Sequence, residues 1–312
     1  MPLDNVIYVN RDGCELRSGD CGKCDQSWLR IIRIPDHITK LGEFDIYICK
    51  KSKLGFINPY PSEDTLCHLY DTKDSTDFDS IKGTIFDSIQ DFLAARQIIK
   101  MVPADRTNVN AILDYSTGNG RYAVTASRLF PNARVDAVDY QNEPPPLIKC
   151  NQDKVNYFHK DLFDKHIQKY DLIILRHVLE HTHYPVRLLK DLGQRLTING
   201  ILYIEVPNLE SGCARVFKKY WTPYYVPRHI FHFTRHSLGE VIDLAGLEGE
   251  IHKKEGGSMG MVMSTFTRKE PSSSINKFFA ISLYPLQIFI EWAYNSSSCL
   301  SACLHRKRIQ SG

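Results

Sequence analysis

Residues 110–139 constrain the fold more than any other part of this 312-residue chain, and they read NAILDYSTGNGRYAVTASRLFPNARVDAVD. A short apolar run leads into a glycine turn, an amphipathic helix and a second apolar run that ends in a carboxylate. In α/β proteins this order places the turn and the acidic side chain at the carboxyl edge of a parallel sheet, where adenosine-containing ligands bind. The stretch therefore predicts an α/β fold with a crevice for a nucleoside.

Each part of this unit has a physical reason. Residues 111–113 form an apolar run that suits a strand buried on both faces, and Asp114 follows at the sheet edge. Gly118 and Gly120 suit a tight turn that a ligand can approach closely. Asp139 ends the second strand, where an ionised carboxylate accepts hydrogen bonds from two ribose hydroxyls. The turn also fits the dinucleotide pattern G-x-G-x-x-A, so a nicotinamide cofactor is an open alternative at this point.

The segment 170–208 reads YDLIILRHVLEHTHYPVRLLKDLGQRLTINGILYIEVPN. Its pattern predicts strands over 170–175 and 201–206, separated by a helix over 185–196 that Asn199 and Gly200 close. This segment resembles the class I S-adenosylmethionine-dependent methyltransferases, in particular the branch with HVLEH after the fourth strand. The resemblance spans 110–266 and implies a Rossmann-like, seven-stranded, mostly parallel sheet sandwiched by helices. A helix over 237–245 and a final strand over 260–267 complete the expectation, with the last pair of strands antiparallel.

The resemblance also implies a cofactor, S-adenosylmethionine, and the residues that bind it. The family pattern D-x-G-x-G-x-G and the acids after strands two and three fall on this chain with one departure, because Ser116 replaces the first glycine. The turn is therefore expected to sit differently around the methionine moiety. The implied cofactor-binding residues are Asp114, Ser116, Gly118, Gly120, Asp139, Tyr140, Asp161, Leu162 and His177.

The resemblance implies methyl transfer to the oxygen of a small molecule, a sugar or a cell-surface glycan precursor. S-adenosylmethionine supplies an activated methyl group, so the protein must align the acceptor and take up the proton of its hydroxyl. Several histidines follow predicted strand tips, and we favour His181 as the catalytic base, with His229 second. A structural role for each of them is the alternative. Two other functions stay open: a nicotinamide-dependent oxidoreductase, and a non-catalytic binding or scaffold protein with a degenerate methyltransferase fold.

The N-terminal residues 1–75 predict a small cysteine-containing module. Cys21 and Cys24 have the C-x-x-C spacing of a zinc knuckle, and Cys49 supplies a third thiol. The fourth position holds Ser52, and serine is a poor zinc ligand. Bound zinc and a metal-free module with buried thiols are both open.

The remaining chain divides into a cofactor-binding methyltransferase domain over 76–270, which includes a helix over 85–101, and an amphipathic tail over 271–312. The net charge of +3 argues against a nucleic-acid partner. The first ten residues lack the apolar run of a signal peptide, which favours a cytoplasmic location. The apolar segment 277–293 and the basic residues 305–308 fit peripheral membrane contact; docking on the domain or on a second subunit, as in a homodimer, is the alternative.

Overall fold

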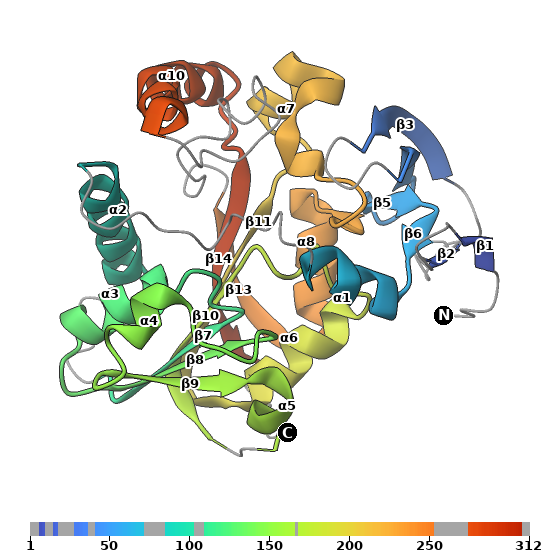
Figure 1. Ribbon diagram of the computed structural model, residues 1–312. Helices are drawn as coiled ribbons and strands as arrows, with labels where there is room; N and C mark the ends of the chain where they lie inside the picture. Colours follow the sequence, from blue (N-terminus) through green and yellow to red (C-terminus); the bar gives the residue numbers. More distant parts are fainter. Residues whose placement is uncertain are drawn as a thin grey trace.

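A seven-stranded sheet forms the centre of the protein (Figure 1). The computed structural model describes residues 6–9, 15–17, 28–36, 41–71, 85–102, 109–165, 168–252 and 274–307. The strand order is β13-β14-β11-β10-β7-β8-β9, and β14 is antiparallel to both of its neighbours while the other pairs are parallel. The strands are β7 (Ala111–Tyr115), β8 (Arg134–Asp139), β9 (Val155–His159), β10 (Tyr170–Arg176), β11 (Leu196–Pro207), β13 (Leu247–His252) and β14 (Cys299–Arg306).

Helices cover both faces of this sheet, as the sequence predicted. Successive side chains of a strand point to opposite faces, and in β10 Leu172 and Ile174 join one buried core while Ile173 and Leu175 join the other. The first core includes residues of α2 (Ile85–Met101), α3 (Arg121–Leu129) and α4 (Pro146–Lys149), and the second includes residues of α5 (Lys160–Phe163), α6 (Pro185–Gln194) and α8 (Arg235–Leu244). The continuous apolar run of β10 is therefore buried on both sides.

The expected boundaries hold for the helix over 85–101 and for the strand that begins at Tyr170. The prediction that Asn199 and Gly200 close a helix over 185–196 is wrong. The helix α6 ends at Gln194, and β11 already begins at Leu196. Gly200 lies inside this strand, where a Cβ would come within 2.7 Å of the carbonyl oxygen of Tyr170. The glycine thus permits close packing of two strands.

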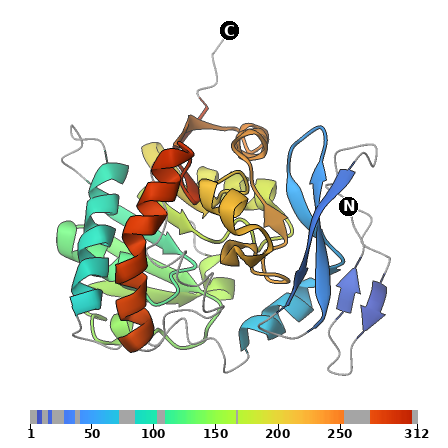
Figure 2. The same ribbon diagram turned by 90° about the horizontal axis from the view of Figure 1, so that it is seen from above.

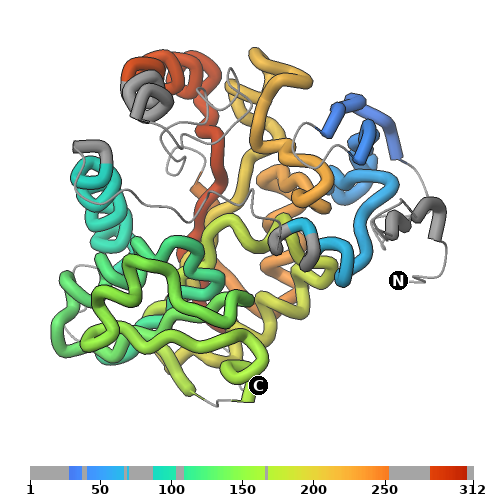
Figure 3. Tube along the Cα trace, in the orientation of Figure 1, coloured from blue at the N-terminus to red at the C-terminus, as the bar shows by residue number. Residues whose placement is uncertain are grey.

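The strand that completes the sheet comes from the end of the chain. The strand expected over 260–267 lies outside the described residues. Instead β14 lies between β11 and β13, with Cys299 opposite Pro207 and Arg306 opposite Leu247. The trace in Figure 3 shows β14 running through the sheet. The sheet therefore extends into the range that the sequence assigned to a tail.

The helix α10 (Ser274–Ala293) precedes β14 and packs against α7 (Gly212–Phe217). Their approach is close, since a Cβ at Gly212 would lie 2.7 Å from that of Tyr294. Phe289 and Trp292 remain exposed on α10. Arg306 is the last residue of β14, and Cys299, at the other end of this strand, is nearer in sequence to α10. In the described part of the chain, no helix has the length and apolar character needed to span a bilayer.

The N-terminal residues form two small antiparallel sheets beside the large one (Figure 2). The first has the order β12-β5-β4-β3, and its strand β12 (Phe231–His232) comes from the loop after β11 rather than from the N-terminus. This loop also contains the short helices η2 (Lys218–Tyr220) and η3 (Thr222–Tyr224). The N-terminal residues therefore hold a loop of the large domain in place. The remaining elements are β1 (Val6–Val9), β2 (Glu15–Arg17), β3 (Trp28–Pro35), β4 (Glu43–Cys49), β5 (Gly55–Asn58), β6 (Tyr60–Pro61) and α1 (Glu63–Asp71).

Candidate active site

The turn between β7 and α3 has the backbone shape that the glycine pattern requires. Ser116, Gly118 and Gly120 all have positive φ angles, of 57°, 57° and 82°. A Cβ at Gly120 would lie 2.4 Å from Cγ1 of Ile148, so this position excludes any side chain. Ser116 adopts the left-handed conformation that the glycine of the family pattern would adopt more easily, at a cost of roughly 1–2 kcal/mol. The serine therefore keeps the shape of the turn, with strain.

Asp114 braces this turn from the inside. Its Oδ2 accepts hydrogen bonds from the hydroxyl of Thr117, at 2.5 Å, and from the backbone N–H of Ala123, at 3.1 Å. Burial raises the pKa of Asp114 to about 6, although the hydrogen bond from Thr117 opposes this shift. The side chain is 4% exposed, so it supports the backbone that would contact the cofactor.

Asp139 stands at the tip of β8 and faces the same turn. Its Oδ2 accepts a hydrogen bond from the N–H of Gly118 and its Oδ1 one from the N–H of Tyr140, both at 2.8 Å. Burial raises the pKa of Asp139, and the two backbone hydrogen bonds oppose the shift. A carboxylate has about four lone-pair sites, so two remain for the hydroxyls of a ribose.

Two large apolar side chains just after the ends of β8 and β9 are exposed. Tyr140 and Leu162 are 57% and 56% exposed, although both are large apolar residues. Asp161, just after the tip of β9, also has an exposed side chain. A ring held against Tyr140 and Leu162 would cover this surface. Together with the bare turn and Asp139, these residues fit an adenosyl cofactor; their roles in binding it stay predictions.

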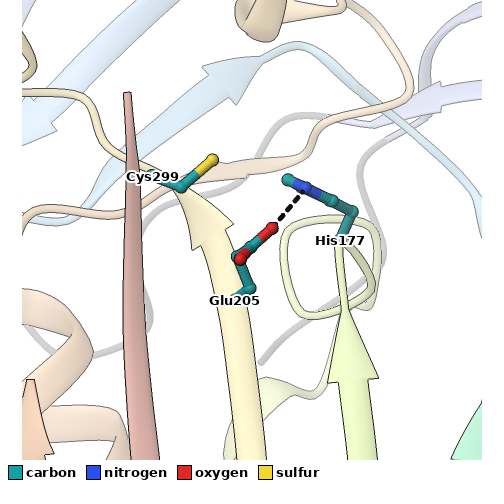
Figure 4. A group of neighbouring side chains, drawn as sticks. All are labelled: His177, Glu205 and Cys299. Carbon is teal, nitrogen blue, oxygen red and sulfur yellow. Dashed lines mark ion pairs between the residues drawn. The ribbon is translucent and has the colours of Figure 1, made fainter. Parts of the chain in front are cut away.

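The other predicted cofactor residue, His177, lies at the end of a buried charged network (Figure 4). Its Nε2 is 3.1 Å from Oε1 of Glu205, and its Nδ1 is 3.4 Å from Oε1 of Glu180. Burial opposes the charged imidazolium, but the two carboxylates outweigh it and raise the pKa of His177 to about 9. His177 is therefore a cation at neutral pH, with a strained backbone φ of 51°.

Sequence reasoning missed the centre of this network. Glu205 is fully buried, and its carboxylate accepts hydrogen bonds from Nη2 of Arg176 at 2.6 Å, Nε2 of Gln97 at 2.5 Å and the hydroxyl of Tyr203 at 2.9 Å. Burial raises the pKa of Glu205, but the opposite effect of Arg176 and His177 is larger. The pKa of Glu205 therefore lies well below its usual value. The sequence did contain a signal for this ion pair: a charged residue accompanies each of two apolar segments. Arg176 directly follows 170–175, and Glu205 lies within 201–206.

The two predicted catalytic histidines lie next to each other. The ring centroids of His181 and His229 are 4.5 Å apart, and the rings meet edge to face. The carbonyl of Glu180 accepts hydrogen bonds from the backbone N–H groups of Ile230 and Phe231, which ties the HVLEH segment to the loop that carries His229. The sequence thus located a real cluster, while a catalytic role for either residue stays a prediction.

Both rings have a defined orientation. Nδ1 of His181 donates to the carbonyl of Arg228 at 3.0 Å, and Nδ1 of His229 donates to the carbonyl of Pro223 at 2.7 Å. Burial lowers the pKa of His181 and lowers that of His229 further. Both are therefore neutral near pH 7, with the lone pair on Nε2. His183 instead contacts the carbonyl of Pro61 and links this segment to the N-terminal residues.

A cavity of about 480 Å³ is lined in part by His183, and by Phe231, whose backbone N–H donates to the carbonyl of Glu180. Leu54, Pro185, Val186, Phe231 and Val241 are among the residues that line it. The predicted cofactor and catalytic residues are not among its lining residues.

The predicted zinc ligands can be placed only in part. Cys21 and Cys24 lie outside the described residues. Cys49 is buried, and its Sγ accepts a hydrogen bond from the N–H of Ser52 at 3.3 Å. The hydroxyl oxygen of Ser52 accepts one from the N–H of Leu54, so it is engaged in the local turn. Zinc at this position stays a prediction.

Similar proteins were found among curated sequences and among solved structures. The curated ribosomal protein uL3 glutamine methyltransferase of Francisella tularensis subsp. tularensis is 27% identical over 136 residues, with 33% of this chain and 43% of that protein covered. This chain thus spans less than half the length of that relative. Among solved structures, the plantazolicin methyltransferase BpumL in complex with SAH is 18% identical, with 79% of this chain and 91% of that chain covered and a TM-score of 0.47. Coclaurine N-methyltransferase bound to N-methylheliamine and SAH is 14% identical, with 74% of each chain covered and a TM-score of 0.48.

A family profile decides the assignment. The profile described as a methyltransferase domain matches residues 86–251, just over half of the chain. The match includes the glycine turn, Asp139 and the histidine cluster. The chain therefore belongs to the methyltransferase domain family.

Proposed function

We propose that this protein is an S-adenosylmethionine-dependent methyltransferase that methylates an oxygen of a small molecule. Family membership supports methyl transfer, and the turn at Gly118 with the carboxylate of Asp139 supports an adenosyl cofactor. The antiparallel strand β14 agrees with the sheet that the resemblance implies, which favours this function over a nicotinamide-dependent oxidoreductase. A sugar or cell-surface glycan precursor is the acceptor class that the resemblance favours, and a cytoplasmic location is the corresponding expectation.

The observation that carries an oxygen acceptor is the neutral histidine pair. When bound, S-adenosylmethionine supplies a methyl group that is already activated. His181 is partly exposed, its Nδ1–H is fixed by the carbonyl of Arg228, and its Nε2 therefore has a lone pair that can accept the proton of a hydroxyl. Glu180 is in position to stabilise the imidazolium that forms, because His177, His181 and His229 all lie around its carboxylate.

The cofactor can be tested without knowing the acceptor. We expect S-adenosylhomocysteine to raise the melting temperature and to bind in calorimetry, because a ligand stabilises the folded state that binds it. Nicotinamide dinucleotides should do neither. Binding of a nicotinamide cofactor alone would favour the oxidoreductase, and binding of neither would favour a non-catalytic protein.

The base can be tested with a panel of hydroxylated acceptors, with release of S-adenosylhomocysteine as the readout. We expect His181→Ala to lower the rate by roughly 10²- to 10⁴-fold, the usual contribution of a positioned base, with cofactor affinity retained. His183→Gln is the matched control, because this neighbouring histidine contacts Pro61 instead of the cluster. An equal loss in both variants would argue for a structural role of His181.

A further inference from the structure

The proposed base, His181, belongs to a group of three potential metal ligands. Glu180, His181 and His229 each contribute one ligand atom, and these atoms lie within 4.8 Å of one another. The backbone fixes the arrangement, because the carbonyl of Glu180 accepts hydrogen bonds from Ile230 at 2.8 Å and from Phe231 at 3.1 Å. The cluster therefore does not depend on its own side chains for assembly.

The histidine rings have the support that metal ligands have in proteins. A metal-bound histidine almost always donates its other ring N–H to a carbonyl or carboxylate, which fixes the tautomer. His181 and His229 both do so through Nδ1, to the carbonyls of Arg228 and Pro223.

The carboxylate of Glu180 is the second, independent observation. Its side chain is 1% exposed, and neither oxygen has a hydrogen-bond partner among the described residues. Oε1 lies 3.9 Å from Nε2 of His229, which must be an acceptor because Nδ1 carries the proton. Two acceptors thus face each other without a donor between them, which is costly for buried groups unless a cation or donor joins them.

His177 supplies part of the missing positive charge. Its Nδ1 lies 3.4 Å from Oε1 of Glu180, but the geometry does not make a hydrogen bond, and its other nitrogen faces Glu205. The second oxygen of Glu180, Oε2, is left without a partner among the described groups. The charge of His177 therefore leaves the coordination of Glu180 incomplete.

We propose that Glu180, His181 and His229 form a site for a divalent transition metal. Two imidazole nitrogens and one carboxylate oxygen suit Zn²⁺, Fe²⁺ or Co²⁺ better than Mg²⁺ or Ca²⁺. Metal bonds of about 2.0–2.2 Å at tetrahedral angles place ligands roughly 3.4 Å apart, so the side chains need to close by about 1 Å. His181 is partly exposed, which gives the ion a path and leaves an open coordination position.

A second group of potential ligands is less suitable. His177, Glu205 and Cys299 lie close together (Figure 4), but Arg176 already neutralises Glu205 through an ion pair of 2.6 Å. Burial raises the pKa of the Cys299 thiol well above its usual range, so it does not become a thiolate near neutral pH.

A bound metal would take the lone pair of Nε2 of His181, so in the metal-bound protein the ion would lower the pKa of an acceptor hydroxyl in place of His181. Only this use of the metal rests on the proposed function. Metal binding itself does not, so the test measures binding first. The metal-free full-length protein is titrated with Co²⁺ and with Zn²⁺, and binding is followed by visible absorption of cobalt and by calorimetry. Methyl transfer is assayed separately, with and without added metal.

Variants separate this site from the cysteines. We expect one equivalent of Co²⁺ whose spectrum lacks thiolate-to-metal charge transfer and which persists in Cys49→Ser. Glu180→Gln and His229→Gln should weaken binding of this equivalent at least tenfold, since even supporting residues around a metal contribute about 10- to 100-fold. His232→Gln is the matched control, because this neighbouring buried histidine is outside the ligand group. Melting of the metal-free variants shows that they fold.

The outcomes are distinct. Cobalt binding that is lost in Glu180→Gln and kept in Cys49→Ser supports the site. The proposed site is overturned if the only cobalt that binds is an equivalent that Cys49→Ser abolishes. It is also overturned if Glu180→Gln binds cobalt with the same affinity as the wild type. Metal binding without methyl transfer to any acceptor would contradict the proposed function and leave the metal site intact. Methyl transfer at full rate in a protein that binds no metal would contradict the metal site and leave the proposed function intact.

Discussion

Removing the carboxylate of Asp139 tests how the glycine turn and the ribose are held. In the unliganded protein this carboxylate accepts two backbone hydrogen bonds of 2.8 Å, from Gly118 and from Tyr140. Asp139→Ala removes both, so that of the two carboxylates that brace the turn only Asp114 remains. Asp139→Asn keeps one acceptor oxygen but places an N–H group toward one of the two backbone donors. The alanine variant should therefore affect both the turn and the cofactor, whereas the asparagine variant removes the charge and keeps at most one of the two backbone hydrogen bonds.

The magnitude follows from these contacts. A hydrogen bond to a charged group contributes about 1.5–3 kcal/mol, and burial of the carboxylate reduces the net gain. We expect Asp139→Ala to weaken the binding of S-adenosylhomocysteine by about 1–3 kcal/mol, which is roughly 5- to 150-fold in Kd. Loss of the brace should also lower the free energy of unfolding of the unliganded protein by about 1–3 kcal/mol.

Isothermal titration calorimetry gives the affinities, and denaturant unfolding of the unliganded protein gives the stability. Asp153→Asn is the matched control, because it removes the same charge from an exposed residue outside the site. We expect the control to bind S-adenosylhomocysteine like the wild type. An Asp139→Ala variant with wild-type affinity would refute the ribose assignment, even if its stability fell.

Three further changes test the turn and the buried network. Ser116→Gly should raise stability by about 0.5–1 kcal/mol in denaturant unfolding, since relief of the φ of 57° outweighs the greater chain entropy of glycine; a loss of stability would show that the hydroxyl has another role. Gly120→Ala should lower stability by about 2 kcal/mol or more and weaken cofactor binding, because its Cβ would overlap Ile148; unchanged melting would contradict the packing. The raised pKa of His177, about 9, stabilises the fold fully below about pH 6.5, and this contribution, at most about 3 kcal/mol, is lost as pH rises through 9. His177→Gln should flatten the stability profile between those pH values, and an unchanged slope would contradict the ion pairs with Glu180 and Glu205.

The sequence predicted those helices and strands whose apolar residues follow a regular local pattern. The segment 170–175 could be identified as a strand because a strand buried on both faces has a nearly continuous apolar sequence. The spacing of the apolar residues in 85–101 identified α2. The strand β14 escaped prediction because its sequence, CLSACLHR, mixes small and polar residues and follows an apolar helix. Its place in the sheet depends on pairing with β11 and β13, which no local pattern reveals.

In the candidate site, too, some features could be predicted from the sequence and others depend on the three-dimensional pairing of strands. The clustering of His181 with His229 was predictable because both follow strand tips, which share one edge of a parallel sheet. The ion pair of Arg176 with Glu205 was not, because it depends on the register that places these two residues opposite each other on β10 and β11. The dual role of Asp139 was also hidden, since its contact with Gly118 depends on the path of the turn.

A crystal structure of the protein soaked with S-adenosylhomocysteine tests the central claim most directly. The account predicts an adenosyl group beside the turn at Gly118 and Gly120, with both ribose hydroxyls donating to Asp139 and the base against Tyr140 or Leu162. A cofactor bound elsewhere, or a ribose that does not contact Asp139, would contradict it.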